Sequence, residues 1–468
     1  MATASFSIRH IEQWRGKPQA ADKKHKDMRK ADKQLWAGTA RQEITPPVGS
    51  PLSGFIARLS VSTSVSDPLF TRALVLRHGQ TIMVLVQMDL LGLARWHVDE
   101  IRRACRGLGA VPPENVLIST THTHSGPGML PVRGCLVASL DYHWSVVRKT
   151  IRAIKQAYAH LQPARLFSNR VRFHLGVNRR EKTANGIVLG VDSKKPAPKF
   201  VDVTELRMDG GRACVLFSHA AHPYVLGGDQ SFISGDFPSF ACQFLERSSG
   251  TTAMFLNGCA GDIAPERAFQ GVEAARAEGS RLAEAVRQAM GGAYEITALP
   301  LRARLEQVHL PHAKLPTLTD LAAMRIQQER TVRPEERTDT AVAAKIRVAL
   351  DDWANAVTRV VNRIDPLEPV FSEVQAFRIG DLCLLAISGE PFFQIGQRIV
   401  RSSPAKNTWA LGYSNFYAGY LPTASAFAEG GYEVSDSFRY LGIWALDPSC
   451  EGRVVTAARK LLIETYGK

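Results

Sequence analysis

The sequence lacks a hydrophobic run long enough to cross a bilayer. Its longest apolar stretch, residues 82–94, is interrupted by Gln87 and Asp89 and is shorter than the roughly 20 apolar residues that a spanning helix needs. The first 35 residues also lack the apolar central run of a secretory signal. We therefore expect neither a membrane span nor a secretory signal, and we interpret residues 82–94 as a buried strand.

Cysteine is sparse as well. The seven cysteines are odd in number and form no Cys-x-x-Cys pair, which argues against a disulfide framework and against a thiolate zinc site. They are Cys105, Cys135, Cys214, Cys242, Cys259, Cys383 and Cys450. This usage predicts a reducing, cytoplasmic location.

Acidic residues are outnumbered: 44 Asp and Glu stand against 58 Lys and Arg, which gives a formal charge of +14. Such a charge favours acidic ligands only in a nonspecific way. The sequence contains no nucleic-acid-binding module and no basic stripe with interleaved aromatic residues, so we expect no specific nucleic-acid partner. Its 45% hydrophobic and 22% charged residues are typical of a globular chain with a large core.

Apolar and amphipathic segments alternate along most of the chain, which predicts an α/β fold with mixed sheets and flanking helices. We expect a basic N-terminal extension over 1–35 and a single domain over 36–468, entered through an irregular segment at 39–55 that is rich in turn residues. Strand-like runs lie at 81–90, 115–119, 164–175, 201–218, 252–256, 296–310, 371–378 and 382–388. Helical runs lie at 95–107, 137–160, 235–248, 272–290 and 317–363, and a further helix is expected to begin near Pro391.

A polar turn with two histidines, His122 and His124, follows the strand-like run 115–119. Binding groups of α/β proteins commonly lie in such turns. Residues two apart in an extended segment face the same way, so both imidazoles can address one site. For an arbitrary His-x-His pair, two hydrogen-bonded structural histidines are about equally plausible.

Two further strand-like runs are followed by candidate ligands. His219 and His222 come after the run that ends near 217, and Glu390 comes after 382–388. A glutamate at a helix start is often only a favourable dipole interaction of about 0.3–1 kcal/mol. In combination, however, two imidazoles and one carboxylate form a common ligand set for catalytic zinc.

Motifs of one known family occur in the family's order from about residue 37 to the C-terminus. They are ITPPVG at 44–49, THTHSGPG at 121–128, GVNR at 176–179, AHP around His222, SGD at 234–236, SGEP around Glu390, and SNFYAGYLPT at 414–423 followed by Tyr432 and Glu433. Together they resemble the catalytic domain of the neutral, non-lysosomal ceramidases. The resemblance implies that family's fold and a hydrolase that cleaves a linear amide bond of an N-acyl compound.

The resemblance also implies a site. It predicts a zinc ion bound by His122, His222, Glu390 and Tyr420, with His124, Arg179 and Tyr432 on the substrate side. In this prediction metal-activated water attacks the amide, His124 or Tyr432 stabilises the oxyanion, and His124 protonates the leaving nitrogen. Asp89 and Asp236 are expected to support the histidines or the fold.

Two departures from the family pattern bear on the substrate. Where the family carries a catalytic serine in Gly-Asp-Val-Ser-Pro, this sequence has Ala264, and we expect Cys259 to be an inert buried thiol rather than a replacement. We also expect no C-terminal immunoglobulin-like domain. Both features favour a small N-acyl amide or lipid-like molecule more soluble than ceramide. Two alternatives stay open: a non-catalytic metal-binding homologue, suggested by Ala264, and an esterase that uses the same site.

Overall fold

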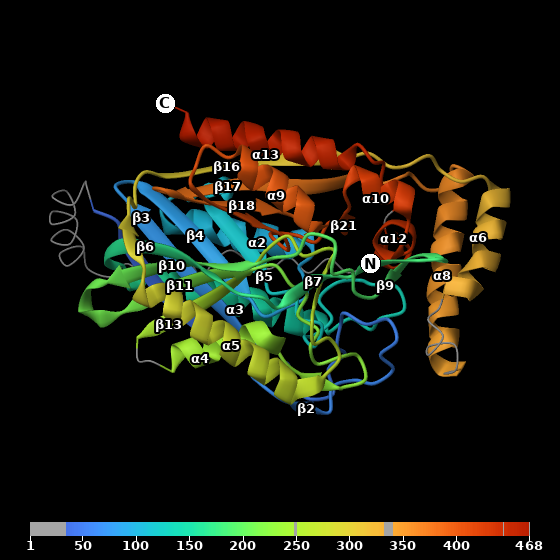
Figure 1. Cartoon of the computed structure of the whole chain (residues 1–468), viewed down its shortest axis with the longest axis horizontal. Helices are drawn as coiled ribbons and strands as arrows, with labels where there is room; N and C mark the ends of the chain where they lie inside the picture. The colour runs from blue at the N-terminus through green and yellow to red at the C-terminus, as the bar shows by residue number, and fades with distance from the viewer. Residues whose placement is uncertain (1–33, 248–249, 332–339, 443, 468) are drawn as a thin grey trace, which may run out of the picture.

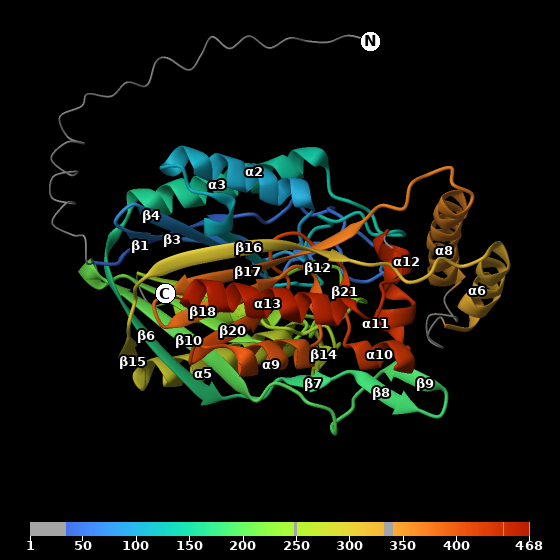
Figure 2. The same ribbon diagram turned by 90° about the horizontal axis from the view of Figure 1, so that it is seen from above.

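The computed structural model describes residues 34–247, 250–331, 340–442 and 444–467, so most of the predicted extension 1–35 lies outside the described residues. These residues form four layers, with two β-sheets packed face to face and helices on the outer side of each (Figures 1 and 2). The predicted α/β class with mixed sheets and flanking helices is confirmed.

The larger sheet has nine strands in the order β13-β11-β10-β6-β1-β3-β4-β5, with β15 paired to β6. Its two halves meet at β1 and β6, which pair over only two residues, at Trp36 and Ala37 of β1. The strands are β1 Trp36–Glu43, β3 Phe70–His78, β4 Thr81–Met88, β5 Val116–Thr120, β6 Gln162–Arg172, β10 Phe200–Met208, β11 Ala213–His219, β13 Thr251–Asn257 and β15 Tyr294–Ile296.

The smaller sheet has four strands in the order β16-β17-β18-β20. They are β16 Leu301–Leu310, β17 Val370–Ile379, β18 Leu382–Ile387 and β20 Asn407–Leu411. Alternation along the strands explains how it packs: Leu382 and Leu384 of β18 face the larger sheet, whereas Cys383 and Leu385 face the helices. Those helices are α9 Phe393–Ser402 and α13 Cys450–Tyr466, which cover the outer face of this sheet (Figure 2).

Two helix pairs cover the outer face of the larger sheet. The first pair, α2 Arg95–Cys105 and α3 Leu140–Ala159, packs on the half that contains β3 and β4. The second, α4 Asp236–Glu246 and α5 Gly271–Gly291, packs on the half that contains β10, β11 and β13. Both pairs bury the branched apolar side chains of alternate strand residues, as the sequence pattern predicts.

Shorter elements complete the described fold. They are β2 Ser64–Val65, β7 Gly176–Asn178, β8 Arg180–Thr183, β9 Gly186–Leu189, β12 Phe232–Ile233, β14 Ile263–Pro265, β19 Glu390–Pro391, β21 Tyr420–Leu421, α6 Leu318–Thr331, α8 Thr340–Val361, α10 Ala424–Glu429, α11 Tyr432–Ser435 and α12 Ser437–Leu441, with one-turn 3₁₀ helices at Arg106–Leu108, Pro113–Asn115 and Asp209–Gly211. Among the residues that the structure describes, no helix has the length and apolar character that spanning a membrane requires.

Several predicted boundaries are wrong. Residues 39–43 belong to β1 rather than to an irregular approach, because their backbone pairs with β3 before the prolines interrupt it. The run 201–218 is two antiparallel strands, β10 and β11, separated by a turn at Asp209–Gly211. Glu390 does not open a helix: it lies in β19, and α9 begins three residues later.

The carboxyl ends of six strands meet at one edge of the two sheets. β4 and β5, β11 and β13, and β18 and β20 are parallel pairs, so their carboxyl ends lie together. Two isolated β-bridges, Ser119 with Ser414 and Gly258 with Leu411, join the larger sheet to the smaller one there. Every loop that leaves these strands therefore begins close to the same point.

Candidate metal centre and active site

His122 lies in the loop after β5, and its backbone has φ of 69°, in the left-handed region. The peptide N–H of His122 donates to the carbonyl of Leu90 at 2.9 Å. The imidazole Nδ1 lies 2.7 Å from the carbonyl oxygen of Leu91. A carbonyl oxygen only accepts, so Nδ1 carries the proton and Nε2 of the neutral ring is left as a lone pair directed into the site.

His222 is oriented in the same way from the loop after β11. Its Nδ1 lies 3.1 Å from the carbonyl oxygen of Ile263, which again makes Nδ1 the donor. Burial lowers the pKa of His222 to about 4, so the imidazole is neutral at neutral pH. The side-chain amide of Asn257, at the end of β13, donates to the carbonyls of Thr121 and Ala221 at 3.1 Å each and thereby ties the two loops together.

Glu390 stands between the two imidazoles. Its Oε2 is 2.9 Å from Nε2 of His222 and 3.4 Å from Nε2 of His122. The hydroxyl of Tyr417 donates to Oε1, and that of Tyr413 reaches Oε2 at 3.5 Å. Glu390 is therefore a carboxylate.

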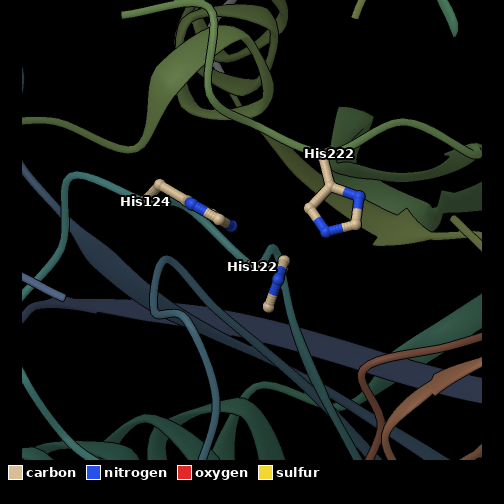
Figure 3. Close-up of side chains that lie close together, drawn as sticks. All are labelled: His122, His124 and His222. Carbon is tan, nitrogen blue, oxygen red and sulfur yellow. The ribbon is translucent and has the colours of Figure 1, made fainter. Parts of the chain in front are cut away.

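This arrangement fits a bound cation. Two imidazole Nε2 lone pairs and an ionised carboxylate oxygen converge, and such acceptors repel one another unless a cation or a proton lies between them. The ligand atoms of His122, His124 and His222 also lie within 4.8 Å of one another. Figure 3 shows the three imidazoles, from the loops after β5 and β11, around a common space.

His124 differs from its two neighbours because neither of its ring nitrogens has a hydrogen-bond partner, although both are buried. Burial, with further effects from His122 and His222, lowers the pKa of His124 well below its usual value. Its ring packs against Phe55 at 5.0 Å and against Tyr224 at 5.3 Å between centroids. The polar atoms of His124 are thus free to bind a ligand.

Tyr420 enters the site through strand pairing. β19 and β21 are parallel, and Glu390 is the register partner of Tyr420, so the two side chains are neighbours. The Tyr420 hydroxyl accepts a hydrogen bond from Nη2 of Arg179 at 3.0 Å. Burial raises the pKa of Tyr420 well above its usual value, whereas Arg179 acts to lower it.

Arg179 and Tyr432 both contact Tyr420. Arg179 is buried and is held by Glu433, whose carboxylate accepts from Nε at 2.8 Å. Tyr432 begins α11, and its ring meets that of Tyr420 edge to face at 6.0 Å. The structure therefore brings all seven sequence-predicted site residues into one region, in which Arg179 and Tyr432 contact Tyr420 and the charge of Arg179 also acts on His124 and His222.

The two aspartates have structural partners. Asp89 forms a buried ion pair with Arg72 at 2.9 Å, and Asp236 accepts from the peptide N–H groups of Leu226 and Phe237. The histidines are oriented by backbone carbonyls instead. Of the two roles expected for these aspartates, the structural one is observed.

Ala264 lies in β14, whereas Cys259 lies in the segment between β13 and β14. Ala264 is buried opposite Val177 and packs with Tyr224. Cys259 is buried, and burial raises the pKa of its thiol well above the usual value, which makes the thiol a poor nucleophile at neutral pH. The expected inert role of Cys259 agrees with this environment.

Three site residues escaped prediction from the sequence. Tyr413 packs against His122 in a tilted arrangement with ring centroids 4.2 Å apart, Tyr417 binds Glu390, and Asn257 joins the loops. Tyr417 lies in the SNFYAGYLPT motif and Tyr413 directly precedes it, so the density of aromatic residues there was the available signal. Asn257 offered only its position directly after a buried strand.

The fold and the site define a class: a four-layer α/β protein whose strand ends enclose a buried set of imidazole, carboxylate and phenol groups suited to a metal ion. Residues 36–271 match the family described as neutral/alkaline non-lysosomal ceramidase, N-terminal. The chain belongs to this family, which confirms the resemblance drawn from its motifs.

Individual relatives agree. The chain is 25% identical over 500 residues to the neutral ceramidase of Mycobacterium tuberculosis, covering 85% of this chain and 74% of that protein. It is 25% identical over 391 residues to the neutral ceramidase of Pseudomonas aeruginosa, covering 69% and 56%. The crystal structure of neutral ceramidase from Pseudomonas aeruginosa has a TM-score of 0.70 at 18% identity, with 92% of this chain and 74% of that chain covered. A structure of a ceramidase complexed with C2 has a TM-score of 0.71 at 18% identity, with 92% of this chain and 75% of that chain covered.

These similarities bear on function at a coarse level. The two structures show the shared fold, and family membership supports a metal-dependent hydrolase that acts on the amide bond of N-acyl compounds.

Proposed function

We propose that this protein is a zinc-dependent hydrolase of a linear amide bond in an N-acyl compound, with the zinc ion bound by His122, His222, Glu390 and Tyr420. The observation that carries the proposal is the convergence of two imidazole Nε2 atoms on one carboxylate oxygen. The carbonyls of Leu91 and Ile263 hold both rings in the tautomer that a metal requires.

Zinc suits this mixed set of nitrogen and oxygen ligands and, when bound, polarises a substrate carbonyl and lowers the pKa of water toward about 7. Tyr420 is the least usual member of the set. Its register pairing with Glu390 and the positive charge of Arg179 beside its hydroxyl support the assignment, because that charge favours a phenolate.

His124 is the residue that we expect to transfer the proton. Its imidazole is neutral and unpartnered, so it can accept the proton of the attacking water and pass it to the leaving nitrogen. Burial disfavours the imidazolium form of His124, so the protonated ring readily gives its proton to the leaving nitrogen. We place Arg179 and Tyr432 at the substrate, where the Tyr432 hydroxyl can donate to the oxyanion of the tetrahedral intermediate.

Two features favour a small, lipid-like N-acyl amide. The wall beside His124 is apolar and aromatic, formed by Phe55, Tyr224 and Ala264, which suits an acyl chain. Ala264 takes the family serine's position in the sequence and has no hydroxyl. All seven cysteines are free. Free thiols support the reducing, cytoplasmic location that we expect from the sequence.

Metal analysis paired with turnover tests the proposal. Purified parent protein is expected to contain about one zinc per chain and to hydrolyse N-dodecanoyl amides. His122→Ala is expected to lose the metal and to lose at least about 100-fold in kcat/KM. Residues that only hydrogen-bond to metal ligands already contribute about 10- to 100-fold, so loss of a ligand should cost at least as much. The exposed His160→Ala serves as the control. A metal-free parent that hydrolyses the amide at full rate would refute the assignment.

Ala264 favours a second candidate, a homologue that binds the metal without turnover. Under that alternative only Ala264→Ser hydrolyses acyl amides, whereas under our proposal the parent does so already. Parallel assays on an amide and the matched ester separate amidase from esterase activity, because both reactions use the same oxyanion site.

A further inference from the structure

A cavity of about 710 Å³ lies beside β11, β20 and α9. Its volume falls in the range of small-molecule sites. Phe200, Phe393, Val400 and Trp409 supply aromatic and aliphatic wall, and the segment Ser218–Ala220 forms part of the lining. None of the residues assigned to the metal or to the substrate contributes to it.

The rim of this cavity is basic. Apart from the buried His219, six lining residues carry or can carry positive charge, against one acidic residue, Asp202. They are Arg170, His174, Lys194, Lys195, Lys199 and Arg401. Arg170 pairs with Asp202, Lys195 pairs with Glu429, and His174 lies beside Glu266.

Three of the six cations have no ion pair with any other described residue: Lys194 and Lys199 on the loop before β10, and Arg401 near the end of α9. They are exposed and come from two elements that flank the opening. These three unpaired positive charges attract an anion. The apolar cavity behind them favours an anion whose remaining surface is apolar.

The deep wall carries no charge. His219 lines the cavity, its Nδ1 lies 2.9 Å from the carbonyl oxygen of Phe200, and its Nε2 has no hydrogen-bond partner. Burial lowers the pKa of His219 to about 4, so the ring is neutral at neutral pH. Positive charge is thus confined to the rim, and apolar groups line the interior.

We propose that this cavity binds a single-chain amphiphilic anion, with its apolar tail against Trp409 and Phe393 and its carboxylate or phosphate at Lys199 and Arg401. The ligand is held by hydrophobic burial and by charge at the opening. The site is separate from the metal centre, and its occupancy does not depend on the proposed hydrolysis.

Isothermal titration with chain-matched probes tests the proposal on the full protein. Decanoate and decyl phosphate are expected to bind, and the comparison of the two identifies the preferred headgroup. Decanol lacks the charge and butyrate lacks the chain, so each is expected to bind at least tenfold more weakly, a difference of about 1.4 kcal/mol. Decanol binding as tightly as decanoate would overturn the proposal.

Variants locate the binding. The double substitution Lys199→Glu with Arg401→Glu is expected to weaken decanoate at least tenfold while hydrolysis and the melting temperature stay at parental values. The double substitution Arg152→Glu with Lys155→Glu, at two exposed positions of α3, is the charge-matched control. If decanoate binds the double variant as it binds the parent, the anion occupies another place, the metal centre included, and the proposal fails whether or not the enzyme hydrolyses amides.

Discussion

Two strand ends each carry a pair of histidines, and the two pairs differ in geometry. After β5, His122 and His124 both face the metal centre, with ring centroids 4.9 Å apart. After β11, only His222 does so, whereas His219 points to the carbonyl of Phe200 and lines the cavity on the other side. One loop thus places both histidines in a single site, and the other divides them between two.

The cause lies in the backbone. His219 is the last residue of β11, so its side chain obeys the alternation of the strand. His122 lies past the end of β5 and adopts a positive φ that few residues other than glycine accept. That strained residue turns its ring toward His222, so spacing along the chain does not determine which histidines meet.

The largest expected effect separates the two histidines of the second loop. His222→Asn keeps an amide donor near the position of Nδ1 for the carbonyl of Ile263 but removes the Nε2 lone pair, so we expect zinc content to fall and kcat/KM to drop at least about 100-fold. His219→Asn, which keeps the corresponding donor for the carbonyl of Phe200, should leave both unchanged. Metal analysis and steady-state kinetics on the two variants measure this, and an equal loss in both would mean that His219 belongs to the site.

A smaller loss of activity is expected when the ring of His124 is shifted by a substitution at a neighbouring residue, while His124 itself is kept. A Cβ on Gly54 would lie 2.6 Å from Cβ of His124, so Gly54→Ala must shift that ring. Misplacement by about 1 Å can reduce the rate about 100-fold, and we expect a 10- to 100-fold loss of kcat with the metal retained.

Gly49→Ala is the matched control for this displacement. Gly49 has φ of 92° against 97° for Gly54, and nothing lies within 4 Å of its added Cβ. Both variants therefore carry the same backbone strain, of about 1–2 kcal/mol, but only Gly54→Ala should lose activity. Equal kcat values in the two would show that the position of His124 does not limit turnover.

The sequence predicted the α/β class, and polar turns after buried strands pointed to His122, His124, His222 and Glu390. Arg179, Tyr420 and Tyr432 were predicted only from the motifs that resemble the ceramidase family. The sequence predicted that His122 and His124 address one site, and their rings do lie together. The reason given, alternation in an extended segment, was incomplete, because the positive φ of His122 turns its ring. Glu390 was placed at a helix start, whereas its pairing with Tyr420 depends on a strand 30 residues away. Orientation by the carbonyls of Leu91 and Ile263 leaves no sequence signal, because any residue supplies a carbonyl.

The amide of Asn257 joins the two loops, so its removal should affect both together. Asn257→Ala leaves the buried carbonyls of Thr121 and Ala221 without their donor, at about 1–3 kcal/mol for a buried unsatisfied group. We expect the free energy of unfolding in urea to fall by about 2 kcal/mol. Asn185→Ala, in an exposed turn, is the control, and equal stability of the two variants would mean that the loops are held by other contacts.

The smallest expected effect is the pH dependence that His219 contributes to stability. Its pKa in the folded protein is about 4, below the value of about 6.5 in an unfolded chain. Between these values the unfolded state binds more protons, so acidification lowers the free energy of unfolding. From about pH 7 to about pH 5.5 the free energy of unfolding of the parent should fall by about 1 kcal/mol more than that of His219→Gln, whose side chain cannot titrate. Contributions from groups common to both proteins cancel.

Urea unfolding at the two pH values measures the difference, and exposed His160→Gln should behave as the parent does. If His219→Gln also matched the parent, the imidazole of His219 would have to be as accessible to protons in the folded protein as in the unfolded chain, which would remove the distinction between an uncharged cavity wall and a basic rim.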